Sequence, residues 1–171
     1  MDVQRAEAGL DGLSFGFLTT LESPAHGLFG GYLLVDEAGR PLEFHCTAPI
    51  KVSRAQAILY GPTLHGHLHG RQIGGTLLGE AGMAPVVVLT DQESLLQVRP
   101  HTDLPVALAR KAEVPVDSAG FTVGPVHVSP PGGEPGRQAT IRERLERLGA
   151  AVDLCEPFER IRAAIDEAQR H

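Results

Sequence analysis

The segment with the clearest chemical potential is TLHGHLHGRQIGG, residues 63–75, in which His65, His67 and His69 occupy alternate positions. Imidazole is a good ligand for transition-metal ions. In a strand all three side chains would point to one side. In a helix each residue turns by about 100°, so only His65 and His69 share a face. A helical segment therefore leaves one pair of histidines, which would need further ligands from elsewhere.

The preceding sequence favours the helix. Ser53, with Gln56 three residues later, forms a capping-box signature that opens a helix through RAQAILY. Pro62 interrupts this helix, but proline is compatible with a first helical turn. We therefore expect a second helix that starts near Pro62, runs through the histidines and continues towards Glu80.

Two interpretations of the histidines follow. In the first, His65 and His69 bind a metal ion, with Glu80, Asp91 or His45 as a further ligand. In the second, which we favour, they lie on a semi-exposed helix face directed towards solvent or a partner chain. Such a face could also respond to pH, because histidine titrates near neutrality.

Asp91 is the second candidate. It ends the run APVVVLTD, residues 84–91, which is apolar on both faces as in a strand buried within a sheet. Ligands of α/β sheets collect at the carboxyl ends of such strands. The alternative, which we favour, is that Asp91 caps a short helix over QESLLQV, for which Asp91 and Ser94 are suitable residues.

The two cysteines, Cys46 and Cys155, lie in unrelated contexts without CxxC spacing, so neither a disulfide framework nor a zinc module is expected. His45 and Cys46 are adjacent on a predicted strand and therefore point to opposite faces, which prevents them from acting as base and nucleophile. Alternation places Cys46 with Leu42 and Phe44 on the inward face, as a small core residue.

The elements can now be ordered. Residues 13–22 predict a strand, GGYLLVDEAGRPLEF predicts a hairpin, SRAQ opens a helix, and VVVLTDQESLL predicts a buried strand followed by a short helix. GFTVGPVHVSP could form a further strand. The fold class is α/β, with a mixed sheet that contains an N-terminal antiparallel hairpin. This β-β-β-α-β-α-β order resembles the ribonuclease-H-like fold over about residues 13–128.

The resemblance has an implication for activity. Nucleases of this family hold two metal ions with carboxylates on the first strand, the first helix and the tip of the fourth strand. Only Asp91 falls on such a position. The first strand offers Thr19 and Thr20, with Glu22 beyond them, and Gln56 stands where the helix would need an acid. We therefore expect the usual nuclease site to be absent.

The end of the sequence predicts a helical tail. SPPGGEPG, residues 129–136, is typical of a linker. Beyond it, two amphipathic helices carry apolar stripes that must be buried against the main domain or against a partner. These stripes comprise Ile141, Leu145 and Leu148, and then Phe158, Ile161, Ile165 and Ala168. The predicted organisation is an extension (1–12), an α/β domain (13–128), the linker and the tail (137–171).

Composition limits the function. The 171 residues are 42% hydrophobic and 21% charged, and no apolar run approaches the ~20 residues of a membrane span. The N-terminus has no secretory signal pattern, which favours the cytoplasm. A net charge of −6 disfavours broad phosphate-backbone binding, although nucleic-acid binding is possible.

Our leading hypothesis is a non-catalytic binding or assembly module of a soluble cytoplasmic complex. It needs no cofactor and binds a protein partner or itself through the tail. The alternative is a metal-dependent hydrolase or nuclease that uses Asp91 with His65, His69 and a divalent ion. Residues 99–117 receive no assignment.

Overall fold

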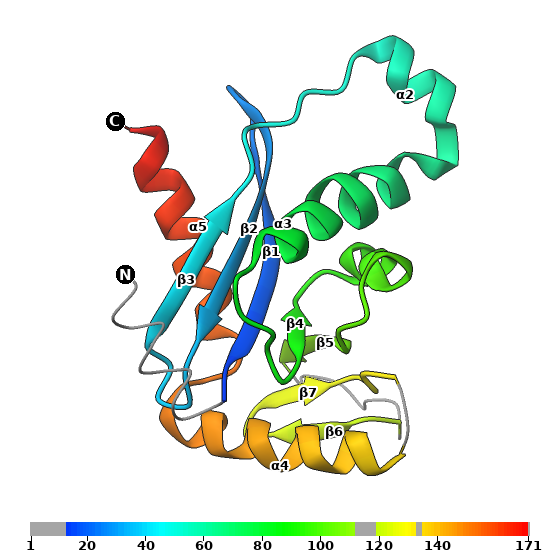
Figure 1. The fold of residues 1–171 in the computed structure, drawn as a ribbon. Coiled ribbons are helices and arrows are strands. Elements are labelled where there is room, and N and C mark those ends of the chain that lie inside the picture. Colours follow the sequence, from blue (N-terminus) through cyan, green and yellow to red (C-terminus); the bar gives the residue numbers. More distant parts are fainter. Residues whose placement is uncertain (1–12, 112–118, 133–134, 171) are drawn as a thin grey trace.

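The structure is a computed structural model that describes residues 13–111, 119–132 and 135–170 (Figure 1). The predicted extension, residues 1–12, lies outside this range. The described strands form one seven-stranded sheet in the order β3-β2-β1-β4-β5-β7-β6. Their bounds are β1 Phe15–Ser23, β2 Gly27–Val35, β3 Pro41–Cys46, β4 Val88–Thr90, β5 Val106–Lys111, β6 Phe121–Val123 and β7 Val126–Val128.

The predicted α/β class with a mixed sheet is confirmed. Strands β1, β2 and β3 are antiparallel, whereas β4 pairs in parallel with both β1 and β5. The predicted hairpin turns at Gly39, whose φ of 80° favours glycine. GFTVGPVHVSP forms two short antiparallel strands, β6 and β7, because the turn at Gly124 has a positive φ of 58°.

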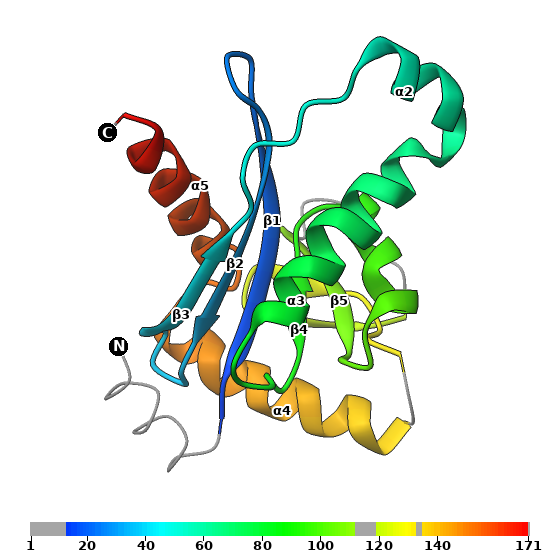
Figure 2. The ribbon, with the colours of Figure 1, turned by 45° about the horizontal axis from the view of Figure 1, so that its top comes forward.

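Helical segments cover both faces of the sheet (Figures 1 and 2). Their bounds are α2 Arg54–Tyr60, η1 Gly61–Thr63, η2 Gly66–Gly75, α3 Thr76–Glu80, η3 Glu93–His101, α4 Pro135–Ala151 and α5 Glu156–Gln169. Alternate strand residues enter two separate cores. Val87, just before β4, and Leu89 of β4 pack in the layer of α4 and α5, whereas Val88 of β4 packs in the layer of η2, α3 and η3.

The C-terminal helices are part of the main core. The stripe of Ile141, Leu145 and Leu148 on α4 is at most 2% exposed, and so are Phe158 and Ile161 on α5. Ser129, at the start of the predicted linker, is also fixed, because its backbone N–H and its Oγ both bond to Leu108 of β5. The apolar stripes are therefore used inside the chain and do not provide the partner-binding surface that we expected of the tail.

The helix through the histidines exists, but its winding differs from our expectation. Its central segment, η2, is a π-helix, a form that is rare and often found at functional sites. Gly66, Gly70 and Gly74 recur every four residues on its side facing η3. A Cβ at Gly70 would stand 2.6 Å from the carbonyl oxygen of Gln97, so the glycines allow η2 and η3 to approach closely.

The interpretation of Cys46 as a core residue is wrong. The pairing of β2 with β3 shifts between Leu34 and Val35, which interrupts the alternation along β3. Leu42 is buried in the core beneath α3, but Phe44 is 41% exposed and Cys46 is exposed. The alternation argument failed because it assumed a regular ladder without a bulge.

Residues 51–63, which we call the arm, project away from the sheet (Figures 1 and 2). The arm contains α2, opened by the predicted capping box: Ser53 Oγ accepts from the N–H of Gln56, and the Gln56 side chain accepts from the N–H of Ser53. None of the α2 residues is buried. In the part of the chain that is described, no helix has the length and apolar character needed to cross a membrane.

Candidate functional site

Asp91 lies at the carboxyl end of β4, next to β1, and is held by two side chains. Thr19 Oγ1 donates to Asp91 Oδ1 at 2.7 Å. Arg162, from α5, donates through Nη2 to Asp91 Oδ2 and to Thr19 Oγ1. The predicted site residue therefore belongs to a three-residue network that joins β1, β4 and α5.

The interpretation of Asp91 as a helix cap is wrong. The N-cap of η3 is Gln92, and no side chain caps the helix there. Gln92 pairs with the neighbouring strand, because Thr20 Oγ1 donates to its Oε1 at 2.6 Å. Ser94, the other expected capping residue, bonds to His69.

The arrangement around Asp91 determines what it can do chemically. A two-metal nuclease site needs several anionic oxygens free to bind cations. Here the single carboxylate faces a guanidinium and a hydroxyl donor, and its strand neighbours are Thr19 and Thr20. Arg162 already supplies the positive charge that a metal ion would supply, so the network is suited to joining α5 to the sheet.

His65 and His69 are neighbours, as helical spacing predicted, with ring centroids 5.5 Å apart. His65 is exposed as expected, whereas His69 is only 8% exposed and its Nδ1 lies 2.6 Å from Ser94 Oγ. Burial, with a smaller contribution from His65, lowers the pKa of His69 below its usual value. His67 lies apart from the pair and stacks on Tyr60 of the arm.

The structure does not bring Asp91 to the histidines. Asp91 bonds to α5, on the face of the sheet that carries Val87 and Leu89, whereas η2 covers the opposite face. Across residues 13–111, 119–132 and 135–170, no three His, Cys, Asp or Glu side chains are grouped so that they could hold a metal ion. The metal hypothesis has no support in this geometry.

Comparisons with known proteins give no further guidance. No family model, curated protein or solved structure matches this chain. The assignment of function therefore rests on the sites themselves.

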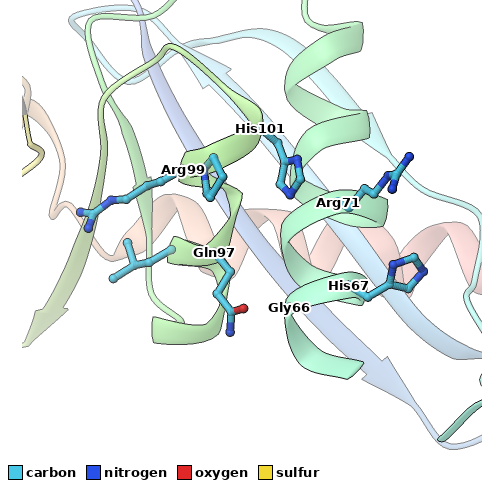
Figure 3. A pocket seen from close by; sticks show the side chains of 8 residues that line it. Gly66, His67, Arg71, Gln97, Arg99 and His101 are labelled. Atoms are coloured by element: carbon cyan, nitrogen blue, oxygen red, sulfur yellow. The ribbon is translucent and has the colours of Figure 1, made fainter. Parts of the chain in front are cut away.

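The groove between η2 and η3, about 580 Å³ in volume, is lined by Gly66, His67, Arg71, Leu96, Gln97, Arg99, Pro100 and His101. Figure 3 shows that His101 and Gln97 point into the space between the helices, whereas His67 and Arg71 point away from η3. The Arg99 guanidinium is engaged elsewhere, because it donates to the backbone oxygens of Val106 and Pro130. The basic side chains thus do not converge on one ligand position.

The neighbourhood of Glu43 is a buried polar cluster beneath α3. Glu43 Oε1 accepts from the N–H of Gly82 at 2.9 Å and lies 2.9 Å from His45 Nε2. Tyr32 is fully buried, and burial together with the charge of Glu43 raises its pKa far above the usual value. Glu43 thereby fastens the loop after α3 to β3, which is a structural role.

Cys155 is not suited to nucleophilic chemistry. Burial, and next the charge of Asp153, raises the pKa of Cys155 to about 11, so its thiol stays protonated at neutral pH. Cys46 is exposed on the edge strand β3.

The arm is the feature that our sequence reasoning missed. Ile58 is 71% exposed, Leu59 is 83% exposed and Tyr60 is 37% exposed. The sequence signal for this exposed surface was the run of three consecutive large apolar residues. The helix that carries them is too short to bury all three side chains. Charge also sets this region apart, because residues 44–79 contain Lys51, Arg54 and Arg71 but no carboxylate, in a chain of net charge −6.

Proposed function

We propose that this protein is a non-catalytic binding or assembly module of a cytoplasmic complex, and that it binds protein through the arm. The proposal keeps the function expected from the sequence but moves the binding surface from the C-terminal tail to residues 51–63. The observation that carries it is the exposure of Ile58 and Leu59 on a projecting helix.

Exposed aliphatic side chains at the tip of a helix favour a protein partner. Burial of apolar surface contributes about 25 cal/mol per Å², so two neighbouring aliphatic residues can anchor an interface. Tyr60 adds an aromatic ring of the kind enriched in binding hot spots. Nucleic acid is a weaker fit, because its phosphate backbone offers no pocket for Ile58 or Leu59, and the chain as a whole is acidic.

The proposal of a non-catalytic role is supported by the partners of Asp91. This residue is the only one that matched an acid of the ribonuclease-H-like nucleases, and Arg162 and Thr19 bind its carboxylate. The relation to that fold is itself part of the proposal. It is supported by three antiparallel strands followed by a helical segment and a strand parallel to β1.

Size-exclusion chromatography of cell extract, which measures the native size of the protein, tests the proposal. The wild-type chain should elute well above its monomer mass, and an Ile58→Glu/Leu59→Glu variant should elute as a monomer. Both side chains are largely exposed, so the variant should fold normally. A matched control places two glutamates at exposed neighbouring positions of α4, Ala139 and Thr140, and should elute like wild type.

Identical elution of the wild type and both variants would contradict a binding role for the arm.

A further inference from the structure

The large apolar side chains that are exposed within the described residues gather in one part of the chain. They are Phe44 of β3 and Ile58, Leu59 and Tyr60 of the arm. Strand β3 ends at Cys46 and the arm begins at Lys51, so only residues 47–50 separate the two features in sequence.

Strand β3 is one edge of the sheet and pairs only with β2 among the described strands. Edge strands with exposed apolar side chains tend to join another chain unless something covers them. Phe44 pairs with Leu33, which belongs to the core beneath α5, so Phe44 lies on the face of the sheet that α5 covers. The edge therefore presents an apolar ring beside α5.

The charges of the two features are complementary. The arm carries Lys51 and Arg54 without any carboxylate. Helix α5, beside the Phe44 face, carries exposed carboxylates at Glu159, Asp166 and Glu167. The arm, with its positive charges and aliphatic side chains, is thus complementary to Phe44 and to the acidic side chains of the neighbouring α5.

The arm and the complementary edge at Phe44 and α5 occur on the same chain, but the arm projects away from its own sheet (Figures 1 and 2). We propose that the partner of the arm is a second copy of this chain, so that the arm of each copy packs on Phe44 and α5 of the other. A two-fold axis satisfies both contacts and closes the assembly, because each copy gives an arm and receives one. This inference rests on the proposed function, since it names the partner of the arm.

The arrangement makes a prediction that an arm-to-arm or an edge-to-edge dimer does not share. An Ile58→Glu/Leu59→Glu copy lacks a functional arm but retains Phe44. A Phe44→Glu copy lacks the receiving edge but retains its arm. Each variant alone should be monomeric, whereas a mixture of the two retains one complete arm-to-edge contact.

Sedimentation velocity of the purified full chain tests this. We expect dimers of wild type, at least a tenfold weaker self-association of each variant alone, and heterodimers in the equimolar mixture. Circular dichroism checks that each variant is folded, and heterodimer formation would itself show that both are. Should Phe44→Glu fail to fold, Phe44→Ser replaces it.

Wild-type protein that is monomeric at every concentration would overturn the inference. So would variants that dimerise like wild type, or a mixture that contains no heterodimer. The proposed function would survive a monomeric purified protein if the extract still showed an arm-dependent complex.

Discussion

Arg162 on α5 and Asp91 at the end of β4 are joined by a direct ion pair, although 71 residues separate them in sequence. Their side chains are 33% and 20% exposed, so the pair lies at the rim of the core. Thr19 bonds to both partners and completes the link to β1. The pair therefore fastens α5 to the centre of the sheet.

The first prediction concerns this pair. Arg162→Ala should lower the free energy of unfolding by about 1–3 kcal/mol, because it leaves a half-buried carboxylate without its charged donor. Arg147→Ala is the matched control, since Arg147 pairs with Glu143 and the two side chains are 62% and 71% exposed. Its cost should stay below about 0.5 kcal/mol. Urea denaturation measures the loss of stability in both variants. Equal losses would show that the contact of Arg162 with Asp91 stabilises the fold no more than an exposed ion pair does.

Metal binding provides a second prediction. Because Arg162 neutralises Asp91 and no cluster of potential metal ligands forms among the described residues, Mn²⁺ should bind no better to wild type than to Asp91→Asn. Isothermal titration with Mn²⁺ makes the comparison. Wild-type binding that disappears in Asp91→Asn would revive the alternative of a metal-dependent hydrolase.

The third prediction follows from buried His69, whose pKa is lowered in the folded state. The unfolded state then binds more protons between the folded and unfolded pKa values, so stability rises with pH through that window. On acidification, stability should begin to fall near the ordinary histidine pKa of about 6.5. His69→Gln should lose less stability than wild type between neutral pH and pH about 5.

Thermal melts across this range measure the effect. His26→Gln is the control, because it removes an exposed histidine. Parallel curves for wild type and His69→Gln would contradict the assignment.

The fourth prediction concerns the glycines of η2. Gly70→Ala should destabilise the fold by about 1–3 kcal/mol, since the new methyl group would meet the backbone oxygen of Gln97. Gly79→Ala, in α3, has no atom within 4 Å of the new Cβ and should be neutral or stabilising by up to about 1 kcal/mol. Denaturation midpoints distinguish the two, and a harmless Gly70→Ala would mean that the two helices can separate.

The sequence predicted the features that depend on local patterns. The hairpin around Gly39, the capping box at Ser53 and the buried strand ending at Asp91 all formed as expected. The features that it missed depend on contacts between distant segments. Nothing near Asp91 indicates Arg162, and nothing in HLHG indicates that Ser94 binds His69. For the same reason the sequence did not show where the tail packs, because its amphipathic stripes are compatible with burial in an internal core and with burial against a partner.

The central claim is that Ile58 lies against another protein in the cell. The most direct measurement is photo-crosslinking from an unnatural amino acid at position 58, with position 139 on α4 as the control. We predict a discrete crosslinked product from position 58 and none from position 139, and a product of twice the chain mass would identify a second copy. Equal crosslinking from both positions, or none from either, would contradict the account.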